Sequence, residues 1–331
     1  MDADAVDYQL PDTAIAQSPL ADREAARLLV DRGPGAVVEH RHVGDLADLL
    51  GPGDLLVVND SRVLPGRLRL QRPTGGTVEV LLLERQDEAR WEALARPSRK
   101  VRPGMRLTGP GIAVDALDDL GDGQWLVAVS GDVEQAGEVP LPPYIHTSLD
   151  DAERYQTVYA RRPVSAAAPT AGLHLTHDVL GRCRARGVEV ATVELAIGLD
   201  TFRPLTTAKV EDHVIHSEAY DVPAETKAAV ERAHRVVAVG TTVVRALESV
   251  AATGSLRGRT QLFIRPGYTF RVVDALLTNF HLPRTTLLAM IEAFVGPRWR
   301  DLYELALREG YRFLSFGDAM FVERMQNSTP A

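Results

Sequence analysis

The chain has 331 residues, with 37 Lys and Arg against 45 Asp and Glu, so its formal net charge is −8. Apolar residues make up 45% and charged residues 25%, which are ordinary globular values and exclude a disordered or collagen-like chain. No apolar run approaches the roughly 18 residues of a membrane helix, and the acidic N-terminal segment lacks secretory features. One cysteine, Cys183, fits a reducing compartment. We therefore expect a cytoplasmic protein without membrane segments, and the length predicts two domains.

The first 63 residues predict strands with a short helix. The segments at 26–32 and 36–43 are apolar enough for a hairpin that turns at Gly33-Pro34-Gly35. DLADLL (45–50) predicts a helix, and DLLVVND (54–60) predicts a buried strand that ends in polar residues.

From about residue 64 to 141 short alternating strands follow one another between turn signals, without a helical pattern between them. This spacing is typical of a small antiparallel barrel. The prolines of PLPPYI (140–145) favour a linker over a strand.

After the linker, strands alternate with helices, which predicts an α/β fold. Predicted strands are 188–195, 235–240, QLFIRP (261–266), FRVVDALLTNF (270–280) and YRFLSFGDAMFVE (311–323). The fold class is therefore α/β, with a mixed sheet and an inserted small antiparallel β-barrel. We expect an α/β domain formed by residues 1–63 plus 146–331 and a barrel domain formed by residues 64–145.

RVVAVGTTVVRALES (235–249) predicts a strand, a glycine turn and a helix that opens on Thr241 and Thr242. The free N–H groups of such a helix start favour an anionic ligand group. An ordinary capped turn explains the same pattern equally well. Neither a dinucleotide fingerprint nor a Walker loop is present, which disfavours NAD chemistry and ATP hydrolysis.

Histidines occur in two further motifs. SAAAPTAGLHLTHDVL (165–180) is a small-residue loop that lets a backbone approach a flat ligand, and it makes His174 a better candidate than His177. In DHVIHSE, strand alternation puts His216 and Glu218 on one face and His213 on the other, so convergence on a metal is poor. A general base oriented by a carboxylate is the more interesting use of His216 and Glu218.

Polar residues also follow buried strands, where α/β proteins commonly bind ligands. These residues are Asn59, Asp60, Arg62, Asn279, His281 and Arg284. Asp318 lies among apolar residues, which is costly unless it is paired or functional. Within the predicted barrel, a local basic cluster of the kind that nucleic acids require consists of Arg96, Arg99, Lys100 and Arg102.

The ordered blocks of the chain resemble one family. The blocks DYQLP, IAQ-PL, LLVVND-R, TGG-VEVLLLER, RPSRK, PLPPYI, ERYQTVYAR, AAPTAGLH, FRPL, HSE, AVGTTVVRALES, DALLTNFHLPR-TLL and YRF-S-GDAM follow in order from about Asp7 to Val322. Together they closely resemble the S-adenosylmethionine:tRNA ribosyltransferase-isomerases of queuosine biosynthesis. The resemblance implies an α/β domain with a β-barrel, which agrees with the pattern of elements.

The resemblance also implies a reaction. The ribosyl part of S-adenosylmethionine, a co-substrate, is transferred to 7-aminomethyl-7-deazaguanine at the tRNA wobble position, and epoxyqueuosine, adenine and methionine result. A base must remove a C5′ proton beside the sulfonium, and a pKa near 7 suits that base. No metal or prosthetic group is expected, and a monomer is favoured.

Hypothetical roles for the residues follow from this chemistry. The proposed catalytic residues are His174, His216, Glu218 and Asp318; the substrate-binding residues are Asn59, Asp60, Arg62, Thr170, Gly172, Thr241, Thr242, Arg245, Asn279 and His281; the tRNA-binding residues are Arg96, Arg99, Lys100 and Arg102. Thr241, Thr242 and Arg245 are expected to hold the methionine carboxylate.

Two positions depart from the family pattern. Where the family commonly has LHVGLGTFRP, this chain has LAIGLDTFRP, so Ala196 replaces a histidine and Asp200 a glycine. If that histidine is the family's base, this chain differs in mechanism or uses another base. Two alternatives therefore stay open: a tRNA-binding paralogue without activity, and a metal-dependent hydrolase that uses His213, His216 and Glu218.

Overall fold

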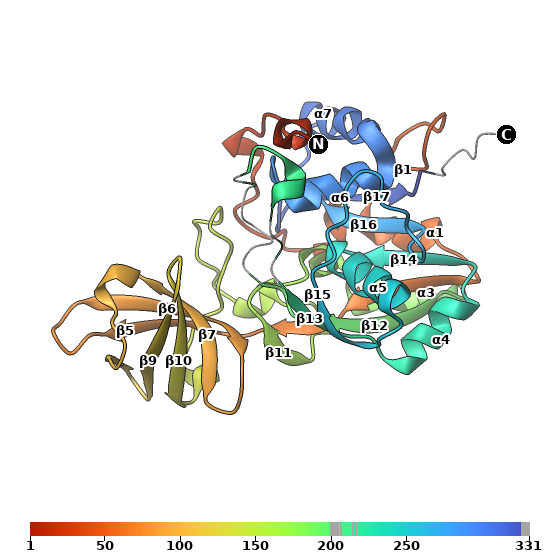
Figure 1. Cartoon of the computed structure of the whole chain (residues 1–331). Coiled ribbons are helices and arrows are strands. Elements are labelled where there is room, and N and C mark those ends of the chain that lie inside the picture. Colours follow the sequence, from red (N-terminus) through yellow and green to blue (C-terminus); the bar gives the residue numbers. More distant parts are fainter. Residues whose placement is uncertain (199–204, 206, 214, 216, 326–331) are drawn as a thin grey trace.

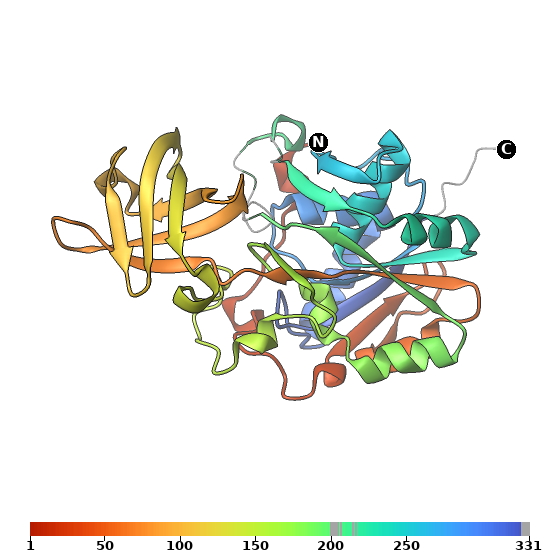
Figure 2. The same cartoon turned by 90° about the horizontal axis from the view of Figure 1, so that it is seen from below.

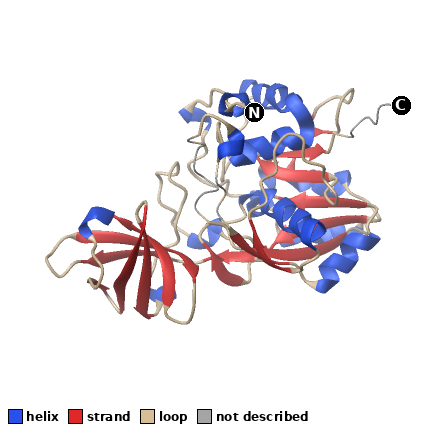
Figure 3. Cartoon of the chain, in the orientation of Figure 1, coloured by secondary structure: helices blue, strands red, loops and turns tan. Residues whose placement is uncertain are grey.

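The computed structural model describes residues 1–198, 205, 207–213, 215 and 217–325. Figures 1 and 2 show an α/β body and, beside it, a β-barrel formed by an early part of the chain. Figure 3 shows the same division by element type, with strands in both parts and most of the helices around the larger sheet. The predicted fold class is confirmed. Among the described residues, no helix is both long enough and apolar enough to cross a membrane.

The α/β body is built on a nine-stranded mixed sheet with the order β15-β13-β12-β3-β14-β16-β17-β1-β2. Strands β12, β3, β14 and β16 run parallel to one another, whereas β17 runs antiparallel to β16. The strands are β1 (Arg27–Asp31), β2 (Glu39–His42), β3 (Asp54–Asn59), β12 (Glu189–Leu195), β13 (Glu218–Asp221), β14 (Arg235–Val239), β15 (Arg257–Thr260), β16 (Ala275–Asn279) and β17 (Ala319–Glu323).

Helices cover both faces of this sheet, and β3 shows why. All six residues of β3 are buried, and alternate side chains enter different clusters: Leu55 and Val57 on one face, Leu56 and Val58 on the other. A strand buried on both faces is a continuous apolar run, as the sequence predicted. The helices are α1 (Leu46–Leu49), α3 (His177–Ala185), α4 (Ala224–Arg232), α5 (Thr241–Thr253), α6 (Thr286–Val295) and α7 (Trp299–Arg308).

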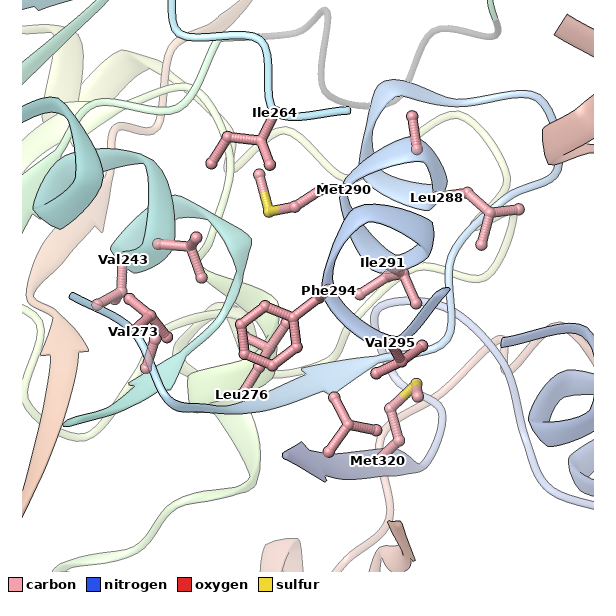
Figure 4. Packing of buried hydrophobic residues seen from close by; sticks show 14 of the residues in the cluster. Val243, Ile264, Val273, Leu276, Leu288, Met290, Ile291, Phe294, Val295 and Met320 are labelled. Carbon is pink, nitrogen blue, oxygen red and sulfur yellow. The ribbon is translucent and has the colours of Figure 1, made fainter. Parts of the chain in front are cut away.

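Helix α6 illustrates the packing of the larger cluster (Figure 4). Its start is capped by Thr285, whose Oγ1 accepts from the N–H of Leu288. Met290 and Phe294 lie one turn apart and belong to the cluster that contains Leu276 of β16. The apolar face of α6 therefore covers the sheet beside the carboxyl end of β16.

The inserted barrel is closed, with the strand order β10-β7-β6-β5-β8-β9. Its strands alternate between core and surface, as Leu68 and Leu70 of β5 do, and Trp125 fills the interior. The strands are β5 (Arg67–Gln71), β6 (Thr77–Arg85), β7 (Arg90–Arg96), β8 (Arg106–Gly109), β9 (Ile112–Gly121) and β10 (Gln124–Gly131), followed by the short helix α2 (Val133–Ala136).

The chain enters the barrel from β4 (Ser61–Val63) and returns through β11 (Arg162–Ser165). These two strands pair in parallel outside the main sheet, with Ser61 opposite Arg162. The barrel is therefore attached where β3 ends, at the edge of the sheet that carries the polar residues.

Three predicted strands differ from the structure. Of YRFLSFGDAMFVE (311–323) only Ala319–Glu323 is a strand, because the chain turns between Leu314, which has a φ of 67°, and Gly317. QLFIRP (261–266) is not a strand, and β15 precedes it at Arg257–Thr260. The first half of FRVVDALLTNF is not a strand either, because its N–H groups donate elsewhere. The buried Glu248 carboxylate of α5 accepts from the N–H groups of Arg271, Val272 and Val273 at 2.9–3.2 Å.

Candidate active site

A cleft lies at the carboxyl ends of β14 and β16, bounded by the loop at 168–171 and by the start of α6. It encloses about 590 Å³, part of it open to solvent. Five residues proposed from the sequence line it: Thr170, Thr241, Thr242, Asn279 and His281. Because β14 and β16 are parallel neighbours, their ends bring residues together that are far apart in the sequence.

Helix α5 presents its N-terminus to this cleft. Gly240 precedes it with a φ of 90°, a conformation that glycine adopts without strain, and no side chain of the described residues caps the first turn. Thr242 Oγ1 accepts from Asn59 Nδ2 at 3.3 Å. The first N–H groups of a 13-residue helix therefore face a cleft lined by hydroxyl groups, an arrangement that favours an anionic group.

Asn279 connects the polar groups at this edge of the sheet. Its Oδ1 accepts from Thr170 Oγ1 at 3.0 Å, and its Nδ2 lies 3.0 Å from His174 Nε2. Nδ2 also donates to the carbonyl oxygens of Leu314 at 3.2 Å and Asp318 at 3.4 Å. These carbonyls require a donor, so they fix the orientation of the amide group.

The orientation of the Asn279 amide determines which ring nitrogen of His174 carries the proton. Because Nδ2 is a donor, Nε2 of His174 must accept, and we place the imidazole proton on Nδ1. Burial, with a smaller contribution from the charges of Arg23 and Arg312, lowers the pKa of His174 to about 4. The expected base with a pKa near 7 is therefore not found at His174, and its ring lines a separate small cleft together with Arg23.

His281 is also buried and neutral. Its Nδ1 and its main-chain N–H both lie 3.1 Å from the Tyr303 hydroxyl, and its Nε2 lies 3.3 Å from Thr278 Oγ1. The Tyr303 oxygen accepts the main-chain N–H, so its own proton is available for Nδ1. Burial lowers the pKa of His281 to about 3. We therefore assign His281 as a hydrogen-bond donor through Nε2–H.

Two other polar residues hold the chain together at this edge. The Asp318 carboxylate accepts from the main-chain N–H groups of Arg27 at 2.9 Å and Arg312 at 2.8 Å. Asn59 Oδ1 accepts from the N–H of Leu195 at 3.1 Å, and its Nδ2 donates to the carbonyl of the same residue at 3.0 Å. The burial of both side chains is thus compensated by main-chain hydrogen bonds.

Asp60 and Arg62 each form an ion pair with another residue. The Asp60 carboxylate lies 3.6 Å from Arg161, and burial raises the pKa of Asp60. Arg62 pairs with Glu153. The structure does not place these two residues among the lining of the cleft described above.

Gly172 has a packing reason to be a glycine. A Cβ atom at this position would lie 2.1 Å from the Tyr159 hydroxyl and 3.0 Å from a methyl carbon of Thr157. The space beside its backbone is therefore filled by the protein itself, and Gly172 does not line the cleft. Its expected role in the approach of a flat ligand is not supported by this packing.

Glu218 and Arg245 form a buried ion pair in a second cleft of about 570 Å³. Arg245 also donates to the carbonyl of Leu262 at 3.2 Å, and Glu218 Oε1 accepts from the N–H of Gly198 at 3.1 Å. Burial lowers the pKa of Arg245 to about 10. Arg245 thus lines the second cleft and not the first, although Leu287 borders both clefts.

Some of the expected residues cannot be placed. His216 and Asp200 lie outside the described residues, so the expected pairing of His216 with Glu218 stays a prediction. Ala196 follows β12, where its N–H donates to the carbonyl of Ala219 at 3.0 Å. Within the described ranges, no three His, Cys, Asp or Glu residues form a group that could hold a metal ion.

The basic cluster of the barrel lies on its surface. Its four side chains are exposed and, in the described part of the chain, form no ion pair: Arg96, Arg99, Lys100 and Arg102. Other arginines are already paired, as Arg182 is with Glu24 at 2.7 Å. Unpaired cations on one loop are available to phosphate groups.

The sequence did not single out Tyr144 and Ser315, which also line the first cleft. The Tyr144 hydroxyl lies 2.7 Å from Ser315 Oγ. Both residues fall in blocks that carried the family resemblance, PLPPYI and YRF-S-GDAM. The motifs were therefore a usable signal, whereas composition and periodicity gave none.

The fold and the cleft define the class of protein: an α/β protein with a barrel insertion and a cleft lined by polar groups at the carboxyl ends of its parallel strands. The family described as queuosine biosynthesis protein matches residues 3–322. The chain belongs to this family.

Individual relatives agree over nearly the whole length. The S-adenosylmethionine:tRNA ribosyltransferase-isomerase of Rubrobacter xylanophilus is 52% identical over 327 residues, covering 97% of this chain and 98% of that protein. That of Thermus thermophilus is 49% identical over 342 residues, covering 96% and 99%. The crystal structure of S-adenosylmethionine tRNA ribosyltransferase from Thermotoga maritima is 35% identical, with a TM-score of 0.56 and coverage of 96% and 99%.

Proposed function

We propose that this enzyme transfers and isomerises the ribosyl part of S-adenosylmethionine onto 7-aminomethyl-7-deazaguanine at the wobble position of a tRNA. Epoxyqueuosine in the tRNA, adenine and methionine are the products. The observation that carries this proposal is the likeness to relatives of that name over 96–97% of the chain. S-adenosylmethionine serves as co-substrate, and we propose that no prosthetic group takes part.

The first cleft supports a site for S-adenosylmethionine. We propose that the N-terminus of α5, with Thr241 and Thr242, holds the methionine carboxylate, because free N–H groups and hydroxyls donate to it there. Thr170, Asn279 and His281 supply further donors and acceptors for the sugar and the adenine. Arg245 contributes indirectly, through its ion pair with Glu218.

The chemistry requires four events. A base removes a proton from C5′, which the neighbouring sulfonium acidifies. Adenine leaves C1′, and the neutral aminomethyl nitrogen attacks that carbon. The sugar oxygen then closes the epoxide as methionine leaves with the sulfur. His216 stays our candidate for the base, and we propose that His174 positions Asn279, since its pKa of about 4 makes it a weak base.

Adenine release from S-adenosylmethionine and substrate tRNA tests the function. Turnover by the purified protein is expected, whereas tRNA binding without adenine release would favour the inactive paralogue. His174→Gln and His216→Gln separate the candidates for the base. Loss of turnover in His216→Gln is expected, and near-normal rates in both variants would overturn the assignment of either histidine as the base.

We also propose that the two domains have different roles. Residues 1–63 plus 146–331 would hold S-adenosylmethionine and the catalytic groups, and residues 64–145 would contact the tRNA through Arg96, Arg99, Lys100 and Arg102. Exposed, unpaired cations on that loop support this role. The enzyme is proposed to act as a cytoplasmic monomer, which sedimentation and cell fractionation would test.

A further inference from the structure

A third cleft lies between the barrel and the α/β body and encloses about 1160 Å³, part of it open to solvent. One wall is the outer face of barrel strands β5, β6 and β7. The opposite wall is formed by the proline-rich linker at 140–145, Tyr155 and the backbone at 166–167. Both parts of the protein therefore contribute to it.

The barrel side of this cleft includes two leucines at positions where a barrel surface is usually polar. Leu81 of β6 and Leu94 of β7 are opposite each other in register, and only 8% and 7% of their surfaces are exposed. Neither belongs to the apolar core inside the barrel. Leu81 and Leu94 line one wall of the cleft, and Pro142 and Pro143 line the other, so each wall has apolar atoms for the face of a base to contact.

Charged side chains lie next to Leu81 and Leu94. Glu79 and Arg96 are opposite each other in the next row of the same two strands. Arg67 Nε lies 3.9 Å from Glu79 Oε1, is buried, and has no hydrogen-bond partner among the residues that the structure describes. Arg96 also begins the basic loop that continues with Arg99 and Lys100, so a positively charged surface leads to the cleft.

The third cleft adjoins the first. Tyr144 and Ala168 line the first cleft, whereas the residues next to them in sequence, Pro143 and Ala167, line the third. Two short chain segments thus separate the clefts. A strand of RNA that places one nucleotide in the first cleft therefore has room for another in the third.

We propose that the third cleft binds an unpaired nucleobase of the tRNA anticodon loop other than the base that is modified; this inference rests on the proposed function. The ring would stack between the leucines and the prolines. Its polar edge would meet the Glu79 carboxylate and the Arg67 guanidinium, and its phosphate would meet Arg96. Splaying a second base out of the loop keeps the modified base unstacked in the first cleft.

Abasic anticodon stem-loop RNAs test this proposal. Each unpaired loop position other than the wobble position is replaced in turn by an abasic ribose, and Kd is measured by fluorescence anisotropy with the full-length enzyme. Leu94→Trp fills the cleft from an outward-facing position. The matched control is Leu126→Trp, which changes an outward-facing position of β10 that does not line the cleft.

For the unsubstituted enzyme, one abasic RNA is expected to bind about tenfold more weakly or worse, the loss of one stacked base. Leu94→Trp is expected to bind the intact RNA more weakly by a similar factor and to lose nothing further with that abasic RNA. Leu126→Trp is expected to match the unsubstituted enzyme. Equal losses in Leu94→Trp and the unsubstituted enzyme, or no position-specific loss, would overturn the proposal.

Two further measurements keep this result distinct from the function itself. If Leu94→Trp does not fold, Leu94→Ala replaces it. Leu94→Ala is likewise expected to bind the abasic RNA no more weakly than it binds the intact RNA. Adenine release by the unsubstituted enzyme is measured in parallel with full-length tRNA. Release without a position-specific abasic loss overturns only the base-binding cleft, whereas no release overturns the proposed function. The cleft variants are also compared with the unsubstituted enzyme for binding of intact RNA and of free guanosine monophosphate. If they bind the RNA equally well but the mononucleotide more weakly than the unsubstituted enzyme does, the cleft is a mononucleotide site and the proposal is overturned.

Discussion

Arg259 in β15 donates to both carboxylate oxygens of Glu84 in β6, with Nη2 to Oε2 at 3.0 Å. The pair joins the edge of the main sheet to the barrel. The same guanidinium donates from Nε to Ser217 Oγ at 2.8 Å and from Nη2 to the Ser217 carbonyl at 2.7 Å. One side chain therefore connects the barrel to the residue that precedes Glu218.

Breaking this ion pair by reversing the charge of Glu84 alone is expected to impair the use of tRNA more than the use of S-adenosylmethionine. Glu84→Arg places two cations side by side, so the barrel shifts relative to the first cleft. We expect kcat/KM for tRNA to fall about tenfold, with KM for S-adenosylmethionine unchanged. The double variant Glu84→Arg, Arg259→Glu restores the attraction and is expected to recover most of the loss in steady-state assays of adenine release.

The control is a pair within the barrel, Arg106 and Asp115, whose atoms are 2.7 Å apart. Asp115→Arg should leave both kinetic constants unchanged. An exposed pair contributes only about 0 to 1 kcal/mol to the free energy of unfolding, so neither variant is expected to unfold. Equal kinetic losses in both variants would contradict a role for the Arg259–Glu84 pair in orienting the barrel.

Replacing Asn279 by Asp is expected to raise the pKa of His174. The new carboxylate faces Nε2 and favours the imidazolium form, whereas the native amide donates to it. The hydrogen bonds to the carbonyls of Leu314 and Asp318 are lost as well, which costs about 1–3 kcal/mol of the free energy of unfolding. NMR titration measures the pKa, with His174→Gln to assign the signal. An unchanged pKa would argue against the assigned amide orientation.

The buried histidines predict a loss of stability in mild acid. Burial lowers the pKa of His174 to about 4 and that of His281 to about 3, from ordinary values of 6.5. The unfolded chain therefore takes up protons below pH 6.5 that the folded protein does not. This contribution to stability is complete above pH 6.5 and decreases as the pH falls toward 4.

The two histidines together should lower the free energy of unfolding by roughly 2 to 3 kcal/mol between pH 7.5 and pH 5.5. Urea unfolding at the two pH values measures this change. His281→Gln should reduce the pH dependence, and His146→Gln, at an exposed position, should leave it as it was. Identical dependence in the His281 variant and the unsubstituted protein would show that this ring is not kept neutral by the fold.

Two glycines provide a matched test of packing. Gly172→Ala places a Cβ atom 2.1 Å from the Tyr159 hydroxyl and is expected to cost about 1–3 kcal/mol of stability. Gly181→Ala, in the middle of α3 with no atom within 4 Å, should stabilise the protein by about 0.5–1 kcal/mol. Thermal melting compares the two, and an increase in melting temperature for Gly172→Ala would contradict the packing described here.

The sequence predicted those features that depend on local pattern. The buried apolar run of β3 and the alternation in the barrel strands each identify their own element. The sequence also predicted that polar residues which follow buried strands line a ligand surface. Asn279 and His281 do line the first cleft, whereas Asp60 and Arg62 do not.

Features that depend on distant partners could not be predicted in this way. FRVV at 270–273 has the composition of a strand, but the Glu248 carboxylate, more than 20 residues earlier, binds its N–H groups. The low pKa of His174 follows from burial and from the charges of Arg23 and Arg312, which are both distant from it in the sequence. Local sequence carries no information about such partners.

The barrel insertion has a consequence for how the protein folds. Strands β3 and β12 pair in parallel, with Leu55 opposite Glu189, so their pairing closes a loop that contains the whole barrel. Loop closure costs conformational entropy before the sheet gains any contacts, but a barrel that has already folded holds its own ends together. We therefore expect the barrel to acquire protection from hydrogen exchange before the centre of the sheet, and the rate of sheet assembly to depend on barrel stability.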